Sequence, residues 1–92
     1  MKPHRSLAGR KHAVYRLAPD LLLVFKPRGH REEEHSHPHR QKLRVLSGAL
    51  AVRTARGETI LRPQSPPLRL AAGRAHSTRA LQDTWVLAES SA

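Results

Sequence analysis

The chain has 92 residues, of which 17 are lysine or arginine and 7 are aspartate or glutamate, giving a formal net charge of +10 at pH 7. It contains no cysteine, which excludes disulfides and thiolate ligands, and it has no run that approaches the roughly 18 consecutive apolar residues of a membrane-spanning helix. The length therefore predicts one domain with a modest core, in which any metal is held by nitrogen and oxygen donors.

Short apolar runs bounded by turn formers predict strands, and no convincing helix, linker or internal repeat is present. We expect about eight strands, with a turn at Pro19 and Asp20 between the first two. The acidic residues 32–34 are expected to form a solvated mouth loop, in which one glutamate can pair with Arg28 or Arg31. The expected strands cover residues 13–17, 21–26, 42–47, 49–54, 58–61, 68–71, 76–81 and 84–89. In this order they fit an all-β fold, a small jelly-roll β-barrel.

A row of histidines interrupts this pattern. His35, His37 and His39 alternate with other residues, and Gln41 continues the same spacing. Side chains alternate faces along a strand, so all four are expected to project to one side of a single strand. Imidazole is the commonest metal ligand among side chains, and a row completed by a distant histidine such as His76 makes a site for a divalent transition metal. The row therefore predicts metal chemistry.

The segment that carries the row resembles the first sequence motif of the cupin family. In that motif a glycine is followed after five residues by His-x-His, then after three or four by glutamate, and after six more by glycine. Here Gly29 precedes His35 by five intervening residues. Three residues separate His37 from Gln41, and six more lead to Gly48. The glutamate alone is changed, to its amide.

The second cupin motif is matched less well. It runs glycine, five residues, Pro-x-Gly, two residues, histidine, three residues, asparagine. Gly73 and His76 fit this pattern, whereas its first glycine, its proline and its asparagine are replaced by Ser65, Ala71 and Ala80. The resemblance implies a single cupin domain, a small jelly-roll β-barrel over residues 1–92, with residues 1–12 as a flexible or edge-strand N-terminal segment.

The resemblance also implies a metal site between the two motifs, with His35, His37, Gln41 and His76 as ligands. Other interpretations stay open: the first two histidines can face solvent in a polar turn, the last can be structural, and Gln41 can form only a hydrogen bond inside the barrel. An amide oxygen is a neutral and poorer donor than a carboxylate, so it lowers metal affinity and raises Lewis acidity. The metal can be zinc, nickel, copper, iron or manganese, and the sequence does not choose among them.

Three further residues have expected positions around the pocket. His39 has the parity of a ligand but no counterpart in the motif, and Pro38 beside it can bend the strand, so we expect His39 at the rim, where it can transfer protons. Thr78 shares a face with His76 by strand alternation and is expected to line the pocket. Trp85 is expected in the core, where it would not serve as a platform for a substrate.

Two classes of function fit such a site. The first is a metal-dependent enzyme of dioxygenase or isomerase type that acts on a small oxygen-bearing molecule. The second is a non-catalytic module that binds or senses a metal or small ligand. The pocket lacks a predicted carboxylate, which argues against catalysis, whereas room for exchangeable ligands argues for it. The fold alone cannot decide between the two classes, because one fold can host many unrelated activities. We rank the enzyme slightly ahead.

The positive charge raises nucleic-acid binding as a remote alternative. The arginines are scattered singly, without a helix-long stripe, and few aromatic residues are available for bases to stack on, so nucleic acid is an unlikely partner. We expect a homodimer, because pairing hides the sheet edges of a short chain, with residues 21–25 and 84–87 as contributors. No membrane partner and a cytoplasmic location are expected, since no apolar stretch of signal-peptide length follows residues 1–10.

Overall fold

Residues 11–91 are described by a computed structural model of the chain, and all of their regular structure is strand. The nine strands are β1 (Ala13–Ala18), β2 (Leu21–Lys26), β3 (Arg31–His35), β4 (Arg40–Ser47), β5 (Leu50–Thr54), β6 (Gly57–Leu61), β7 (Leu68–Leu70), β8 (His76–Ala80) and β9 (Thr84–Ser91). Every pairing is antiparallel. One sheet has the order β1-β2-β9-β4-β7 and the other the order β3-β8-β5-β6. The predicted all-β jelly-roll fold is confirmed.

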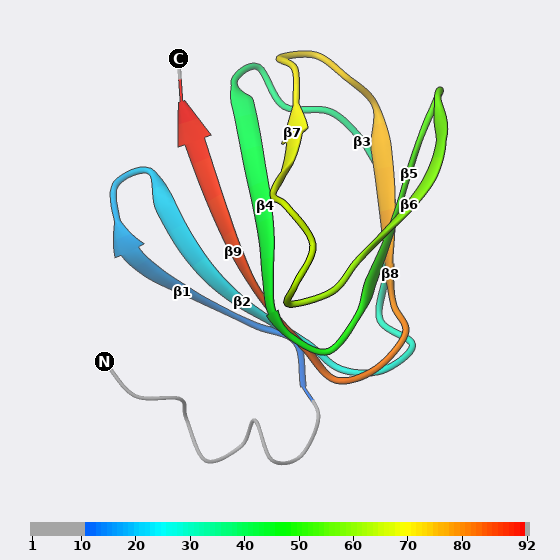
Figure 1. Cartoon of the computed structure of the whole chain (residues 1–92). Helices are drawn as coiled ribbons and strands as arrows, with labels where there is room; N and C mark the ends of the chain where they lie inside the picture. Colours follow the sequence, from blue (N-terminus) through cyan, green and yellow to red (C-terminus); the bar gives the residue numbers. More distant parts are fainter. Residues whose placement is uncertain (1–10, 92) are drawn as a thin grey trace.

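The two sheets face each other and lie closest together at one end (Figure 1). The turns β4–β5 and β8–β9 meet there, and we call this the closed end, made by residues 48–49 and 81–84. The sheets diverge towards the opposite end, the open end, where β9 finishes and the connection from β3 to β4 lies. Each sheet combines strands from distant parts of the chain, so the chain crosses between the layers repeatedly, as a jelly roll requires.

The inner faces of the two sheets carry the hydrophobic core. Leu43 and Val45 alternate along β4 and are 6% and 2% exposed, and Leu50 and Val52 on β5 are fully buried. This confirms the prediction that Leu43 and Val45 share one face of their strand and that Leu50 and Val52 share one face of the next strand. The remaining members of the core cluster are Val24, Leu61, Leu70, Ala80, Val86 and Ala88. Burying a Val or Leu side chain contributes roughly 1.5–3 kcal/mol, so these few residues supply most of the driving force for folding.

A glycine and a threonine fasten the closed end. Gly48 has a φ of 91°, and a Cβ atom there would meet the carbonyl oxygen of Asp83 and the Thr84 side chain. The Thr84 hydroxyl accepts a hydrogen bond from the Ala49 amide at 3.1 Å and lies 2.7 Å from the carbonyl of Gln82, to which it can donate. Only glycine allows the two turns to approach this closely.

The expectation of one continuous histidine strand is wrong. β3 ends at His35 and β4 begins at Arg40, so His37 and His39 lie in the connection between two strands of different sheets. Pro38 lies at its centre, and a residue without an amide hydrogen cannot extend a strand ladder. The four side chains therefore do not share a strand face, and their arrangement depends on the loop.

The expected mouth loop at residues 32–34 is also wrong, because these residues lie inside β3, which pairs with β8. Of the predicted N-terminal segment 1–12, only residues 11 and 12 fall within the described part of the chain, and both precede β1. Residues 11–91 contain no helix that is long and apolar enough to cross a membrane.

Candidate metal centre

Three histidines meet at the open end of the barrel. His35 is the last residue of β3 and His76 the first of β8, and the two are direct partners across the strand pair. His37 reaches them from the connecting loop. Each ring offers one nitrogen, and these three nitrogens lie within 4.8 Å of one another. The arrangement therefore brings three imidazoles from separate segments to one point, which fits a transition-metal site.

Backbone carbonyls orient two of the rings. Nδ1 of His35 donates a hydrogen bond to the carbonyl of Glu33 at 2.7 Å, and Nδ1 of His76 donates to the carbonyl of Arg74 at 3.1 Å. A carbonyl oxygen can only accept, so Nδ1 carries a hydrogen in both rings, and in the neutral form of each ring the lone pair is on Nε2. Hydrogen bonds of this kind fix the tautomer and direction of metal-binding histidines. The donor set therefore fits a metal ion.

The third ring is positioned by the loop, and its surroundings favour its neutral form. The Gly73 amide donates a 2.7 Å hydrogen bond to the carbonyl of His37. Gly73 has a φ of 76°, which permits the turn that leads into β8. Burial lowers the pKa of His37, and the three neighbouring imidazoles lower it further. A neutral imidazole is the form that binds a metal, so the crowding favours ligation over protonation.

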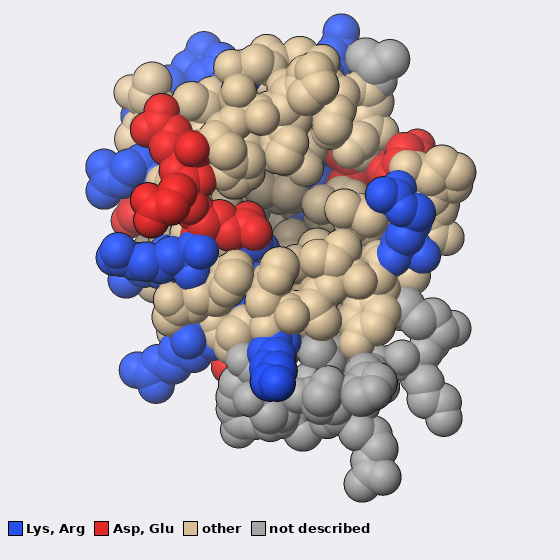
Figure 2. Space-filling model, turned by 180° about the vertical axis from the view of Figure 1, so that it is seen from behind, with Lys and Arg blue, Asp and Glu red and all other residues tan. Residues whose placement is uncertain are grey.

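The three histidines line a cavity between the sheets with a volume of about 500 Å³. Seen from behind, the surface is visibly hollowed there, with acidic side chains along one side (Figure 2). Most of the wall is apolar and comes from Leu22, Val24, Leu43, Leu50, Val86 and Ala88. A largely apolar cavity with a few convergent polar groups is the usual form of a small-molecule site.

Of the other residues that the sequence placed around the site, two line this cavity and two do not. Gln41 on β4 and Thr78 on β8 both line the cavity. His39 is not among the lining residues, and its ring stacks on that of His37 with centroids 5.4 Å apart. Trp85 is only partly buried, on the other face of its sheet and 5.0 Å from the ring of Phe25, so the prediction that it lies in the core is wrong. It does not line the cavity either. The structure thus brings the three histidines together, places Gln41 in the wall of the same cavity and leaves His39 outside it.

A partly buried ion pair in the same cavity was missed by the sequence reasoning. Lys26 is 6% exposed, and its Nζ lies 2.9 Å from Oε1 of Glu32. The prediction that Arg28 or Arg31 pairs with this acidic segment is therefore wrong for Glu32. The sequence could have indicated this, because Lys26 follows Val24 by two positions on β2 and therefore has its side chain on the same inward face.

Two further histidines lie behind Glu32. Nε2 of His12 and Nε2 of His30 are 3.9 and 3.8 Å from its Oε2, and their rings stack at 4.3 Å and 8°. Lone pairs in the planes of parallel rings run side by side and do not converge, so this group is poorly suited to hold an ion. Burial lowers the pKa of His12, and the charges of His30 and Lys26 lower it further. The cluster instead surrounds the carboxylate of Glu32.

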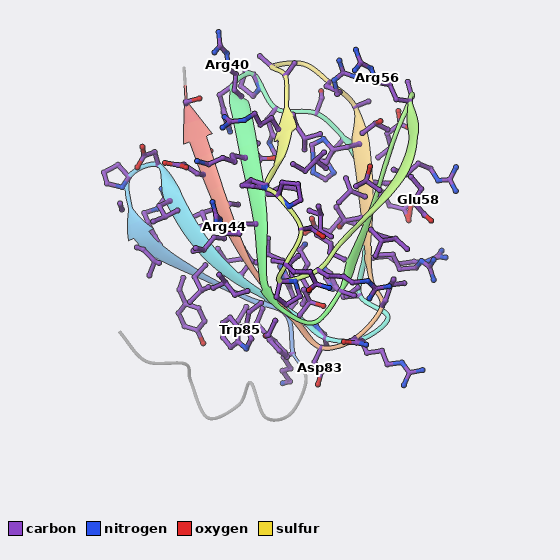
Figure 3. All side chains as sticks on the ribbon, viewed as in Figure 1. Arg40, Arg44, Arg56, Glu58, Asp83 and Trp85 are labelled. Carbon is purple, nitrogen blue, oxygen red and sulfur yellow. The ribbon has the colours of Figure 1, made fainter. Side chains whose placement is uncertain are left out.

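A basic groove adjoins the cavity at Gln41. Its volume is about 600 Å³, and it lies between β4, β7 and the β5–β6 hairpin. The cations that line it are Arg40, Lys42, Arg56, Arg69 and Arg74. Two of them, Arg40 and Arg56, are seen at the open end (Figure 3). Lys42 pairs with Glu89 at 2.9 Å, whereas the four arginines make no ion pair within residues 11–91. Folding therefore collects positive charge that is scattered in the sequence.

Comparisons with known proteins give structural neighbours only. No family model and no curated protein matches the chain. KdgF from Halomonas sp. is 26% identical, with a TM-score of 0.68 over 86% of this chain and 76% of that one. A cupin superfamily protein from Desulfitobacterium hafniense is 12% identical, with a TM-score of 0.71 over 87% and 75%. The Cupin_2 domain of an XRE family transcriptional regulator from Enterobacter cloacae is 19% identical, with a TM-score of 0.69 over 84% and 90%.

Proposed function

We propose that this chain, which has the cupin fold, holds a divalent transition metal with His35, His37 and His76 and uses it to act on a small oxygen-bearing molecule. The observation that carries the proposal is the convergence of three imidazole nitrogens within 4.8 Å at the mouth of a cavity. Gln41, which lines the same cavity, is the fourth donor in this proposal, through its amide oxygen. The metal is one of zinc, nickel, copper, iron or manganese.

The donor set determines what chemistry the site favours. A bound divalent ion would supply Lewis acidity towards an oxygen atom of the ligand. Three imidazoles and an amide are all neutral, so no donor reduces the charge that the ligand meets. Apolar side chains line part of the space beside the histidines, and the ring of His39 stacks on that of His37 from outside the cavity wall. These features support an enzyme of dioxygenase or isomerase type.

A non-catalytic sensor or binding module is the second candidate. It is favoured by the donor set, because no carboxylate belongs to the histidine triad in the described part of the chain. Glu32, which lines the same cavity, is paired with Lys26. The cupin domain of a transcriptional regulator shares the fold. Testing the metal-loaded protein for turnover of small hydroxy and keto acids separates the candidates, because a sensor binds such molecules without converting them.

Metal content is the test of the site itself. We expect one equivalent of a divalent metal by plasma mass spectrometry after the protein is loaded and desalted. The double variant His35→Ala, His37→Ala removes two of the proposed ligands and should retain none. His39→Ala is the matched control, because it deletes an imidazole of the same loop outside the cavity wall. Equal metal content in all three proteins would refute the assignment.

A further inference from the structure

Two buried polar atoms have no hydrogen-bond partner in the described part of the chain, and both belong to residues that neighbour Glu32. They are Nε2 of His30 and Oγ1 of Thr78. The first lies 3.8 Å from Oε2 of Glu32, and Thr78 is the direct partner of Glu32 across the β3–β8 pair. Buried polar atoms are almost always bonded, so two exceptions around one residue indicate a missing partner.

The neighbouring lysine also has spare hydrogen-bonding capacity. An ammonium group carries three donors, and the contact of Lys26 with Glu32 uses one. The ammonium group of Lys26 forms no other hydrogen bond within residues 11–91. Lys26, Glu32 and Thr78 all line the 500 Å³ cavity, and we call these three the inner polar subsite. The subsite therefore holds unused donors in the wall of the cavity that the metal-centre histidines also line.

The inner polar subsite is within reach of the metal centre. Thr78 follows His76 by two positions on the same inward face of β8, and both are buried, at 7% and 4% exposure. Two residues along a strand span roughly 6.6 Å. A molecule whose oxygen lies at the histidines can therefore reach Thr78 through a chain of about three to five atoms.

The charge of the subsite determines which group it accepts. Lys26 and Glu32 neutralise each other, so the subsite has no net charge to attract an ion. It offers donors from Lys26 and Thr78 and acceptors from Thr78 and Glu32 within a small space. A hydroxyl group both donates and accepts, and it fits this combination better than a carboxylate, which Glu32 would repel, or a methyl group, which would leave Thr78 unpaired.

We propose that the inner polar subsite binds a hydroxyl group of the molecule whose other end meets the metal centre. The ligand is then a short hydroxy compound with a metal-binding oxygen at one end. This inference rests on the proposed function and narrows its substrate class. The competing occupant is an ordered water, which would satisfy the same atoms.

Matched hydroxamates test the proposal on the zinc-loaded protein. Acetohydroxamate binds the metal alone. 4-Hydroxybutanohydroxamate and pentanohydroxamate add a chain of equal length that ends in hydroxyl or methyl, and homologues one carbon shorter and longer cover the reach. By calorimetry we expect the best hydroxyl probe to bind about 5- to 10-fold tighter than its methyl counterpart, the gain typical of one or two well-made hydrogen bonds. Thr78→Val, which keeps the side-chain shape, should abolish this preference.

Thr59→Val is the control, since Thr59 is exposed on β6, and it should leave the preference unchanged. Failure of acetohydroxamate to bind would refute the proposed function together with this inference. If acetohydroxamate binds but no hydroxyl probe is preferred at any length, the inference alone is refuted. In the metal-free protein, Thr78→Val should melt at a higher temperature, because it removes an unpaired buried hydroxyl. A lower melting temperature would show that a resident water fills the subsite and would overturn the proposal.

Discussion

Two threonines inside this barrel are buried to nearly the same degree and are bonded in opposite ways. Thr84 at the closed end is 0% exposed, and its hydroxyl has the Ala49 amide and the Gln82 carbonyl as partners. Thr78 in the cavity is 7% exposed, and its hydroxyl has none. Saturated hydrogen bonding at one end provides stability, whereas unused hydrogen bonding in the cavity leaves capacity for a ligand. The two regions of one barrel thus have different tasks.

The largest expected effect is at the closed end. Gly48→Ala forces a Cβ atom against the Asp83 carbonyl and strains a residue whose φ is 91°. We expect a loss of about 3 kcal/mol or more in the free energy of unfolding, measured by urea denaturation. Gly29→Ala is the control, because φ is 86° there but the space around a Cβ is open, so it should lose only about 1 kcal/mol. Equal losses would show that crowding contributes nothing.

Removing the buried ammonium should weaken the cavity side by a smaller amount. Lys26→Met keeps the apolar stem and leaves the half-buried Glu32 without its ion-pair partner. Breaking a fully buried pair costs about 3–5 kcal/mol, and the partial exposure of Glu32 reduces this to about 1–3 kcal/mol. Arg53→Met, which breaks an exposed pair with Glu58, should cost under about 0.5 kcal/mol. A cost for Lys26→Met no larger than that of Arg53→Met would mean that burial adds nothing to the pair.

The same ion pair predicts a response to acid. Burial on its own raises the pKa of Glu32, but the hydrogen bond and charge of Lys26 outweigh it and leave the pKa below the ordinary value of 4.5. A carboxyl group whose pKa is lowered by folding stabilises the folded state above its unfolded pKa, and this contribution is lost as the pH falls below about 4.5. The stability difference between wild type and Lys26→Met should therefore shrink between pH 5 and pH 3, roughly the range over which such a carboxyl group titrates. A difference that stays constant over this range would contradict the assignment.

The threonine comparison itself predicts changes of opposite sign. Thr84→Val leaves the buried Ala49 amide without its acceptor and should lower the free energy of unfolding by about 1–3 kcal/mol. Thr78→Val should raise it, by up to about 1 kcal/mol, because it removes an unpaired buried hydroxyl. Thermal melts of the two variants, recorded side by side, measure this difference. The comparison is direct because each variant replaces a buried threonine with valine. Two losses of equal size would remove the distinction between the regions.

The smallest effect concerns the basic groove. If its charge acts only through phosphate contacts, binding to a DNA duplex should be weak and should vanish as salt approaches 0.2 M, about the range over which counterion release dominates. Arg40→Ala combined with Arg56→Ala should weaken binding at low salt, whereas His35→Ala should not. Tight, sequence-selective binding at physiological salt would instead require contacts to base edges and would revive nucleic-acid recognition as the function.

Much of the fold follows from local patterns, and what the patterns missed has physical causes. The apolar alternation of Leu43 with Val45 and the turn at Pro19 are local signals, and the corresponding strands are confirmed. β3 was missed because its three consecutive glutamates show no alternation. It forms because β8 offers an open edge, so tertiary pairing overrides weak strand propensity.

Motif spacing identified the histidines of the candidate site. The residues that reach the site or its surroundings only through packing could not be predicted. The motif singled out His35, His37 and His76, and the structure brings their nitrogens together. The predicted continuous strand is not the cause, because β3 ends at His35 and His37 lies in the loop that follows. Lys26 was missed because a lysine that ends an apolar run suggests a strand terminus facing solvent. The basic groove could not be predicted, since its arginines come from four separate segments and meet only when the sheets pack.

The main-chain bond from Gly73 to His37 has a consequence for the kinetics of metal uptake. It joins the loop that carries one imidazole to the loop that precedes another, so in the proposed site the main chain that carries the rings is ordered without an ion. A chelating site that is ordered in advance loses little conformational entropy on binding. Uptake should then be limited by exchange of water from the incoming ion, and the rate should rank the metals by their hydration kinetics, with no common slow phase from loop closure.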